Sequence, residues 1–172
     1  VAGEVVFNTA MTGYPESLTD PSYSGQLMVL TYPLVGNYGV PPRTFEANGL
    51  ATFMESEKIH AEAIIVSDYS FEYSHWNAVE SLGSWLKDEK VAGIYGIDTR
   101  ELTKLLREKG SMKGKIVFDA ADEIDFVDPN LINQVDIVSC KEVITYGNGS
   151  KKVVLVDCGV KHNIIRCLLK RD

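Results

Sequence analysis

The sequence predicts an α/β protein, and three patterns support this fold class. Apolar segments of high β-propensity recur through the first hundred residues, separated by segments rich in turn formers. An amphipathic helical segment at 99–109 lies between two of these predicted strands. Near the end, the continuous apolar run at 153–157 precedes a helical segment at 163–170, which is the β-turn-α opening of a doubly wound domain.

Five strands are expected in the first part of the chain. The first joins three successive apolar residues, Val5 to Phe7, to polar ends. After the second strand, Pro33 and the glycines and prolines between 36 and 42 predict a long loop. The expected strands are 3–9, 26–32, 60–66, 91–97 and 115–118.

A first helix is predicted over 74–87. Trp76, Val79, Leu82 and Leu86 recur at intervals of three or four residues, which is the spacing of one helix face. A serine at the start of this segment could accept a hydrogen bond from the first turn.

A second helix is predicted directly after Asp98. Asp98 and Glu101 have the spacing of a capping box, in which each side chain satisfies a backbone N–H near the other residue. Three leucines then line one face, and Gly110 stands where a helix commonly ends.

The chain divides into two predicted domains of unequal size. Residues 1–150 form the first domain, with connecting sequence from about 119, and 151–172 begin the second. One strand and one helix cannot cover both faces of a buried strand, so the second domain is expected to be truncated here. The chain also begins without Met, and we expect it to be part of a longer protein.

Composition narrows the classes of partner. The 172 residues carry a formal net charge of −7, and Lys and Arg form no cluster larger than a pair such as Lys151–Lys152, so neither nucleic acid nor an anionic membrane is an expected partner. Three cysteines without metal-ligand spacing indicate an intracellular, reducing compartment and no metal site. No apolar run approaches the ~20 residues of a membrane span.

Two motifs could carry chemistry but have simpler explanations. Cys158 and His162 are four residues apart, as an activated thiolate and its base could be, yet buried packing is the commoner role of such a cysteine. Residues 147–152 combine glycine with lysine, but they precede a strand, whereas a phosphate-binding loop follows one. We favour packing for the first and a flexible connection for the second.

The polar loop after the first strand is the better candidate. Asp20–Pro21 restricts the local backbone, and Ser22 and Ser24 then present hydroxyls that can donate and accept. Such a loop, held between two strands, could offer a hydroxyl to a polar ligand. A turn or helix-capping serine is the alternative that local sequence alone favours.

Four longer stretches together resemble the small subunit of carbamoyl phosphate synthetase, over essentially the whole chain. They are GEVVFNTAMTGYPESLTDPSYSGQ, LTYPLVGNYG, GIDTRELTKLLREKGSMKGKI and VVLVDCGVKHNIIRCLL. The stretch LTYPLVGNYG, and the DCG in the stretch VVLVDCGVKHNIIRCLL, look closest to the fused animal forms of the enzyme. The resemblance implies a β/β/α swivelling-type N-terminal domain, followed by the first β-α unit of a class I glutamine amidotransferase domain.

The resemblance also implies a reaction for the complete enzyme. Its amidotransferase domain hydrolyses L-glutamine, and a large synthetase unit combines the ammonia with bicarbonate and two ATP, with Mg²⁺, to make carbamoyl phosphate for pyrimidine, arginine or urea synthesis. The nucleophilic Cys of that domain would lie outside these residues, so no catalytic residue and no cofactor site is expected here. A scaffold or regulatory domain of an ammonia-dependent synthetase is the alternative. Cytoplasm and mitochondrial matrix are both compatible compartments.

One family residue carries over with a specific role. The serine of the family's T-D-P-S-Y motif contacts glutamine from the N-terminal domain, and here it is Ser22. Lys161 matches a family lysine near the same cleft, and Arg100 in Asp98-Thr99-Arg100 is a candidate for subunit contact. The expected partners are the remaining amidotransferase domain and the synthetase unit.

Overall fold

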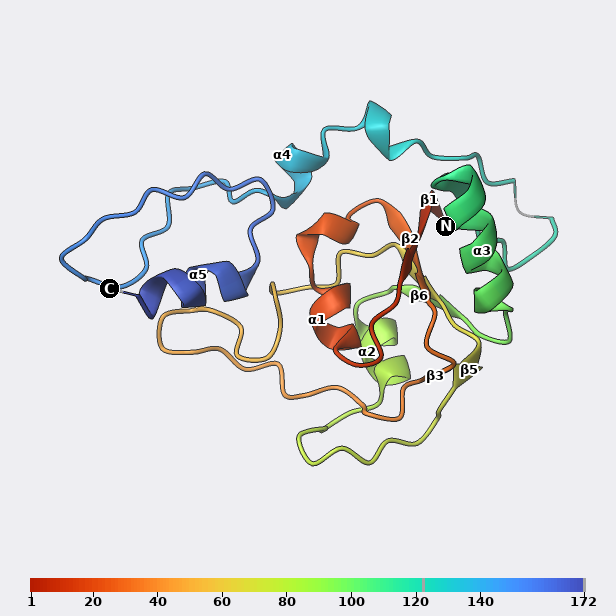
Figure 1. Ribbon diagram of the computed structural model, residues 1–172, viewed down its shortest axis with the longest axis horizontal. Coiled ribbons are helices and arrows are strands. Elements are labelled where there is room, and N and C mark those ends of the chain that lie inside the picture. The colour runs from red at the N-terminus through yellow and green to blue at the C-terminus, as the bar shows by residue number, and fades with distance from the viewer. Residues whose placement is uncertain (122, 172) are drawn as a thin grey trace.

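A five-stranded mixed sheet organises the first part of the chain (Figure 1). The computed structural model describes residues 1–121 and 123–171. The sheet has the order β6-β4-β2-β1-β7, in which β7 alone is antiparallel to its neighbour. These strands are β1 (Ala2–Asn8), β2 (Gln26–Leu30), β4 (Ala63–Ile65), β6 (Ala92–Ile94) and β7 (Met112–Lys115), and a separate pair joins β3 (Leu34–Val35) to β5 (Asp68–Tyr69).

Helices cover both faces of the sheet, so the α/β prediction is confirmed. Figure 1 shows α3 on the opposite side of the sheet from α1 and α2. The helices are α1 (Tyr14–Leu18), α2 (Leu82–Asp88), α3 (Thr99–Lys109), α4 (Gln134–Val138) and α5 (His162–Leu169), with short 3₁₀ turns at η1 (Pro21–Tyr23) and η2 (Pro129–Leu131).

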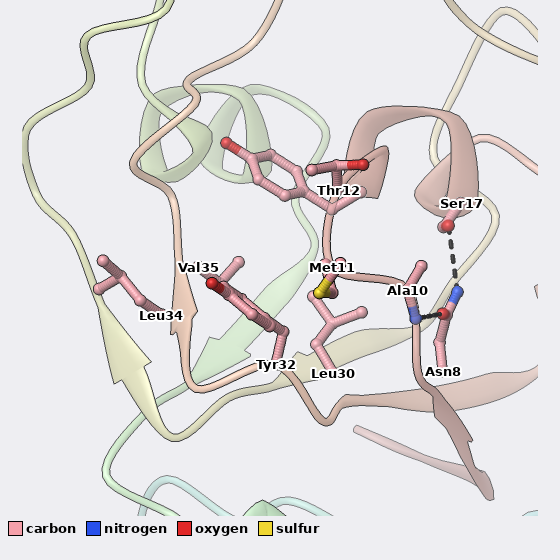
Figure 2. Close-up of a pocket in the computed structure, with 10 residues that line it drawn as sticks. Asn8, Ala10, Met11, Thr12, Ser17, Leu30, Tyr32, Leu34 and Val35 are labelled. Carbon is pink, nitrogen blue, oxygen red and sulfur yellow. Dashed lines mark hydrogen bonds between the residues drawn. The ribbon is translucent and has the colours of Figure 1, made fainter.

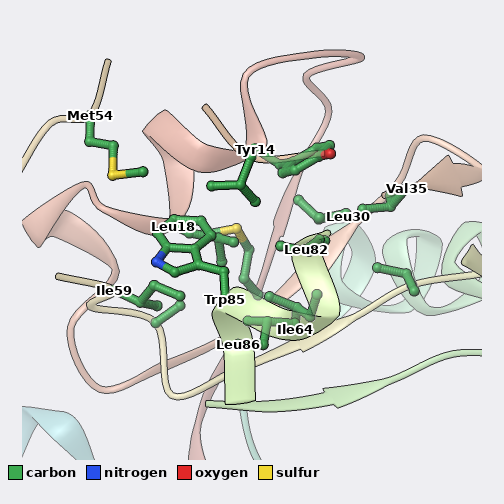
Figure 3. Close-up of a cluster of buried hydrophobic side chains, with 14 of the residues drawn as sticks. Tyr14, Leu18, Leu30, Val35, Met54, Ile59, Ile64, Leu82, Trp85 and Leu86 are labelled. Carbon is green, nitrogen blue, oxygen red and sulfur yellow. The ribbon is translucent and has the colours of Figure 1, made fainter. Parts of the chain in front are cut away.

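Strand β2 lies in the middle of the sheet and is buried on both faces. Because side chains alternate along a strand, Leu27 and Val29 join the core beneath α3, and Met28 and Leu30 join the core beneath α1 and α2. Figure 3 shows the second of these cores, where the ring of Trp85 packs among aliphatic side chains. Burial on both faces explains why the sequence here reads as a continuous apolar run.

The predicted helix over 74–87 was wrong in its first half. Only 82–88 is helical, with the Ser81 side chain accepting a hydrogen bond from the Ser84 N–H at 3.1 Å. The preceding segment pairs instead with the 36–40 loop, since Val40 and Glu80 form a bridge. Trp76, placed on the apolar face of that helix by its spacing, is 87% exposed. A periodic pattern could not reveal this long-range pairing.

Strand β7 begins three residues earlier than predicted. The antiparallel register places Gly114 opposite Gly3, and a side-chain carbon on Gly114 would lie 2.4 Å from a methyl group of Val5. A glycine is therefore needed at this crossing. The sequence MKGK has little β-propensity, so the apolar residues that follow it misled the prediction.

The last predicted strand does not form. Residues 153–157 have no strand partner within the described chain, and Val154 is almost fully exposed. The sequence of this run suits a strand buried on both faces, but no described strand pairs with it. The helix predicted after it is present as α5. The proposed division at residue 150 stays a prediction. No helix in the described residues is both long and apolar enough to cross a membrane.

Candidate functional site

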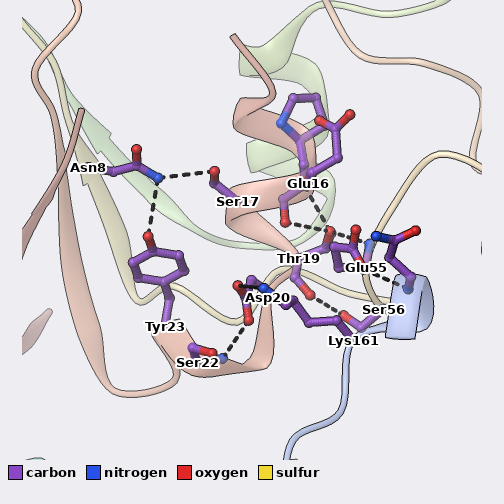
Figure 4. A network of polar contacts seen from close by, with 12 residues as sticks. Asn8, Glu16, Ser17, Thr19, Asp20, Ser22, Tyr23, Glu55, Ser56 and Lys161 are labelled. Carbon is purple, nitrogen blue, oxygen red and sulfur yellow. Dashed lines mark hydrogen bonds and ion pairs between the residues drawn. The ribbon is translucent and has the colours of Figure 1, made fainter. Parts of the chain in front are cut away.

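The polar loop between α1 and β2 is held by its own side chains. Asp20 precedes the 3₁₀ turn η1, and its carboxylate accepts a hydrogen bond from the Ser22 backbone N–H at 3.0 Å. Pro21 occupies the first position of the turn and is buried. The same carboxylate forms an ion pair with Lys161 at 3.3 Å, as Figure 4 shows. This one aspartate therefore orients the turn and joins it to the start of α5.

The Ser22 side chain is exposed at the outer edge of this turn. Its hydroxyl makes no hydrogen bond to any part of the chain that the structure describes, although its backbone is held by Asp20. Ser24 differs, because its hydroxyl donates to the Gln134 side chain at 2.9 Å and so ties the loop to α4. Of the two serines singled out in the sequence, Ser22 is the one whose hydroxyl is available to a ligand.

A buried threonine anchors the start of the loop. Thr19 is 0% exposed, and its hydroxyl donates to the Pro15 carbonyl at 2.8 Å and accepts from the Glu55 N–H at 3.0 Å. The Thr19 carbonyl also accepts from the Ser56 hydroxyl at 2.6 Å. Sequence reasoning missed Thr19, since Glu55 and Ser56 lie far along the chain from it.

The turn before α5 packs directly against the loop. Gly159 has φ 97°, and a side-chain carbon there would approach Val138 to 2.8 Å and Pro21 to 3.2 Å. Asp157 closes this turn by accepting hydrogen bonds from the Gly159 and Val160 N–H groups, each at 2.8 Å. Burial raises the pKa of Asp157, but hydrogen bonds from backbone N–H groups outweigh burial and lower it. The carboxylate therefore stays ionised and holds the turn beside Pro21.

Helix α5 docks on the 46–55 loop through polar side chains. The Arg166 guanidinium donates to Glu46 at 2.9 Å and to the carbonyls of Ala51 and Met54. The His162 ring accepts a hydrogen bond at Nδ1 from the Ala51 N–H at 2.9 Å. This contact requires the neutral imidazole, and burial together with the Arg166 charge lowers the pKa of His162.

The structure gives no support to a Cys158–His162 catalytic pair. His162 uses its Nδ1 for Ala51, and Cys158 is exposed and forms no hydrogen bond with His162 among the described residues. Burial, the explanation preferred for Cys158, was also wrong. No cluster of three or more potential metal ligands occurs in the described part of the chain.

A small cavity beside α1 is too small for a substrate. It holds about 10 Å³, roughly the lower limit for one water, and Asn8, Tyr32 and Val35 are among the residues that line it (Figure 2). Asn8 donates to the hydroxyls of Ser17 and Tyr23, each at 3.1 Å, and so braces α1 and η1 from the strand side.

The described residues thus define an α/β domain that presents an exposed, backbone-anchored hydroxyl where it meets a C-terminal helix. Residues 1–116 match the family described as carbamoyl-phosphate synthase small chain, CPSase domain. The chain therefore belongs to the carbamoyl-phosphate synthase small-chain family, as its sequence motifs indicated.

Several relatives are similar over 99% of this chain. The mitochondrial carbamoyl-phosphate synthase (ammonia) of Homo sapiens is 53% identical over 173 residues, which are 12% of that protein. The arginine-specific small chain of Eremothecium gossypii is 52% identical over 177 residues, 44% of its length. The multifunctional protein CAD of Squalus acanthias is 51% identical over 174 residues, 8% of its length. The chain spans less than half the length of each.

Proposed function

We propose that this chain is the N-terminal part of the glutamine-hydrolysing region of a carbamoyl phosphate synthetase. In the complete enzyme this region supplies ammonia, and a synthetase unit uses it with bicarbonate and ATP to form carbamoyl phosphate. The observation that carries the proposal is the identity of about one half, over 99% of the chain, to both separate small chains and fused synthetases.

Within that enzyme, Ser22 lends its hydroxyl to a glutamine site built mainly by the remaining amidotransferase domain. The exposed hydroxyl, without a partner in the described chain, supports this role. So does its place beside the 157–161 turn, where the resemblance puts the start of that domain. Asp20 and Thr19 hold the turn still, and a pre-oriented hydroxyl loses less freedom when the ligand binds.

The finer architecture and the remaining partners belong to the same proposal. The first domain is of the swivelling β/β/α type, and residues 151–172 begin the amidotransferase domain, whose sheet would pair with the exposed 153–157 run. ATP and Mg²⁺ act in the synthetase unit, and this chain contributes no catalytic residue. The enzyme works in the cytoplasm or the mitochondrial matrix.

The test is Ser22→Ala in the complete synthetase. Losing a hydrogen bond to a charged substrate group costs about 1.5–3 kcal/mol, so the KM for glutamine should rise by about ten- to hundredfold. Synthesis from free ammonia should be nearly unchanged. Ser24→Ala is the matched control, because the Ser24 hydroxyl is directed to Gln134. Equal losses with glutamine and with ammonia would assign Ser22 a folding role.

A second candidate is a scaffold or regulatory domain in a synthetase that uses free ammonia. The 53% identical human relative is named as a carbamoyl-phosphate synthase (ammonia), which favours this alternative. Nitrogen-source kinetics of the complete enzyme separate the two proposals. An enzyme that forms carbamoyl phosphate from ammonia but not from glutamine is the ammonia-dependent type, and Ser22→Ala would then change neither KM.

A further inference from the structure

A groove about 890 Å³ in volume runs along the carboxyl ends of the parallel strands, on the sheet edge away from residues 20–26. Thr9 and Thr31 directly follow β1 and β2, and Ser67 and Gly96 come two residues after β4 and β6; all four line it. In open α/β sheets this edge is the usual place for a bound partner or ligand.

One face of α3 gives the groove a positive wall. Arg100, Lys104 and Arg107 line it at the spacing of a single helix face. Lys104 is paired with Glu101 at 2.9 Å, whereas neither arginine forms an ion pair within residues 1–121 and 123–171. Each unpaired guanidinium could therefore form a bidentate pair with a carboxylate of a partner.

A hydroxyl and two carboxylates also line the groove. Thr99, at the start of α3, is 3% exposed and lines the groove, and its hydroxyl has no hydrogen bond to another described residue. This hydroxyl is not fully buried, so it is open to solvent or to a ligand in the groove. Asp68 and Asp98 line the groove too, and the Asp98 carboxylate already accepts from the Glu101 N–H at 2.9 Å. Three cations thus face two carboxylates, one of which is engaged in helix capping.

Next to the groove stands a cluster of rings, Tyr69, Phe71 and Tyr95, which we call the aromatic wall. Its ring centroids are 4.9 to 6.2 Å apart, and two of the three pairs are edge to face. Phe71 is 70% exposed and Tyr95 59% exposed. The Tyr69 hydroxyl accepts from the Gly83 N–H at 2.8 Å, which holds the wall against α2.

The aromatic wall adjoins the groove lining along the chain. Asp68, which lines the groove, directly precedes Tyr69 in β5, and Tyr95 directly precedes Gly96, which also lines it. Exposed rings beside unpaired arginines are the composition of energetically dominant patches in protein interfaces. An open groove lined by hydroxyls and charges is unlike the enclosed, apolar pocket of a small molecule.

We propose that an acidic segment of the synthetase unit docks in this groove, against the aromatic wall. The inference rests on the proposed function, since it takes the synthetase unit as the partner. Charge complementarity selects an acidic segment for the two arginines. The human relative contains 88% of its sequence outside the matched part, so such a segment has ample chain from which to come. Its carboxylates pair with Arg100 and Arg107, and its aliphatic carbons cover Phe71.

The first experiment is site-specific cross-linking in the complete enzyme. A photo-reactive label on Arg107→Cys should join to a peptide of the synthetase unit that contains Asp or Glu, identified by mass spectrometry. The same label on Lys87→Cys, which lies in α2 and does not line the groove, should give no such product. Cross-links only to a second copy of this chain, or none to the synthetase unit, would overturn the docking proposal.

The second experiment reverses the charges. Arg100→Glu with Arg107→Glu should lower glutamine-dependent synthesis by about tenfold or more, because each arginine is a candidate interface hot spot. Lys87→Glu with Lys109→Glu carries the same charge change and should stay within about twofold of the parent. If the parent makes no carbamoyl phosphate from either nitrogen source, the proposed function fails. If it does, and the groove variant matches its control, the docking proposal alone fails.

Discussion

Replacing Thr19 by valine should loosen the candidate glutamine loop without changing its shape. Valine keeps the volume and branching of threonine but loses the hydroxyl that accepts from the Glu55 N–H and donates to the Pro15 carbonyl. The carbonyl keeps a second donor, the Thr19 N–H at 3.1 Å. The part-buried Glu55 N–H loses the one hydrogen-bond partner that it has in the described chain, and a donor left unsatisfied away from water costs about 1–3 kcal/mol. We therefore expect the free energy of unfolding to fall by about 2 kcal/mol.

The assay is urea denaturation of the chain, supported by thermal unfolding. A loss of about 2 kcal/mol in a domain of this size should lower the Tm by about 4–8 °C. Thr19→Ser is the comparison, because it keeps the hydroxyl and removes one methyl group, at a cost of about 1 kcal/mol. Valine should therefore be worse than serine. If serine is as destabilising as valine, or worse, packing and not hydrogen bonding anchors the loop, and the account of Thr19 is wrong.

Three further predictions follow from packing and protonation. Trp85→Ala should cost about 3–5 kcal/mol in urea denaturation, and Trp76→Ala, at an exposed position, less than about 0.5; similar losses would place both rings in the core. Gly114→Ala should cost about 1–3 kcal/mol through its clash with β1, whereas Gly93→Ala meets only ordinary contacts and should be tolerated; equal Tm values would refute the register. Folding lowers the pKa of His162, so its contribution to stability is complete above about pH 6.5 and is lost as pH falls below it. His162→Asn should flatten that acid-side decline, and an unchanged slope would mean that the ring is not a neutral acceptor.

Much of the sheet was predictable because its signals are local. Strand β2 is apolar on both faces, and the Asp98 side chain accepts from the Glu101 N–H as the sequence spacing indicated. The reciprocal half of that capping box is absent, since the Glu101 carboxylate pairs with Lys104. The errors arose where distant partners decide the structure, as in the pairing of Val40 with Glu80 that excludes residues 74–80 from the helix.

The candidate site shows the same limit more sharply. Asp20–Pro21 indicated a restrained turn, but the contacts that restrain it join distant residues. Thr19 and Glu55 are 36 positions apart, and Asp20 and Lys161 are still farther apart. No local pattern encodes such pairs. As a consequence, the turn that carries Ser22 is held both by residues near it in the chain and by the segment that leads into α5. A change in the 157–161 turn would therefore shift the position of Ser22 through the Asp20 carboxylate, even though Lys161 need not touch the ligand.

Lys161→Met, which keeps the side-chain length and removes the charge, should raise the glutamine KM of the complete enzyme less than Ser22→Ala does. A larger effect of Lys161→Met would mean that the lysine binds the substrate directly.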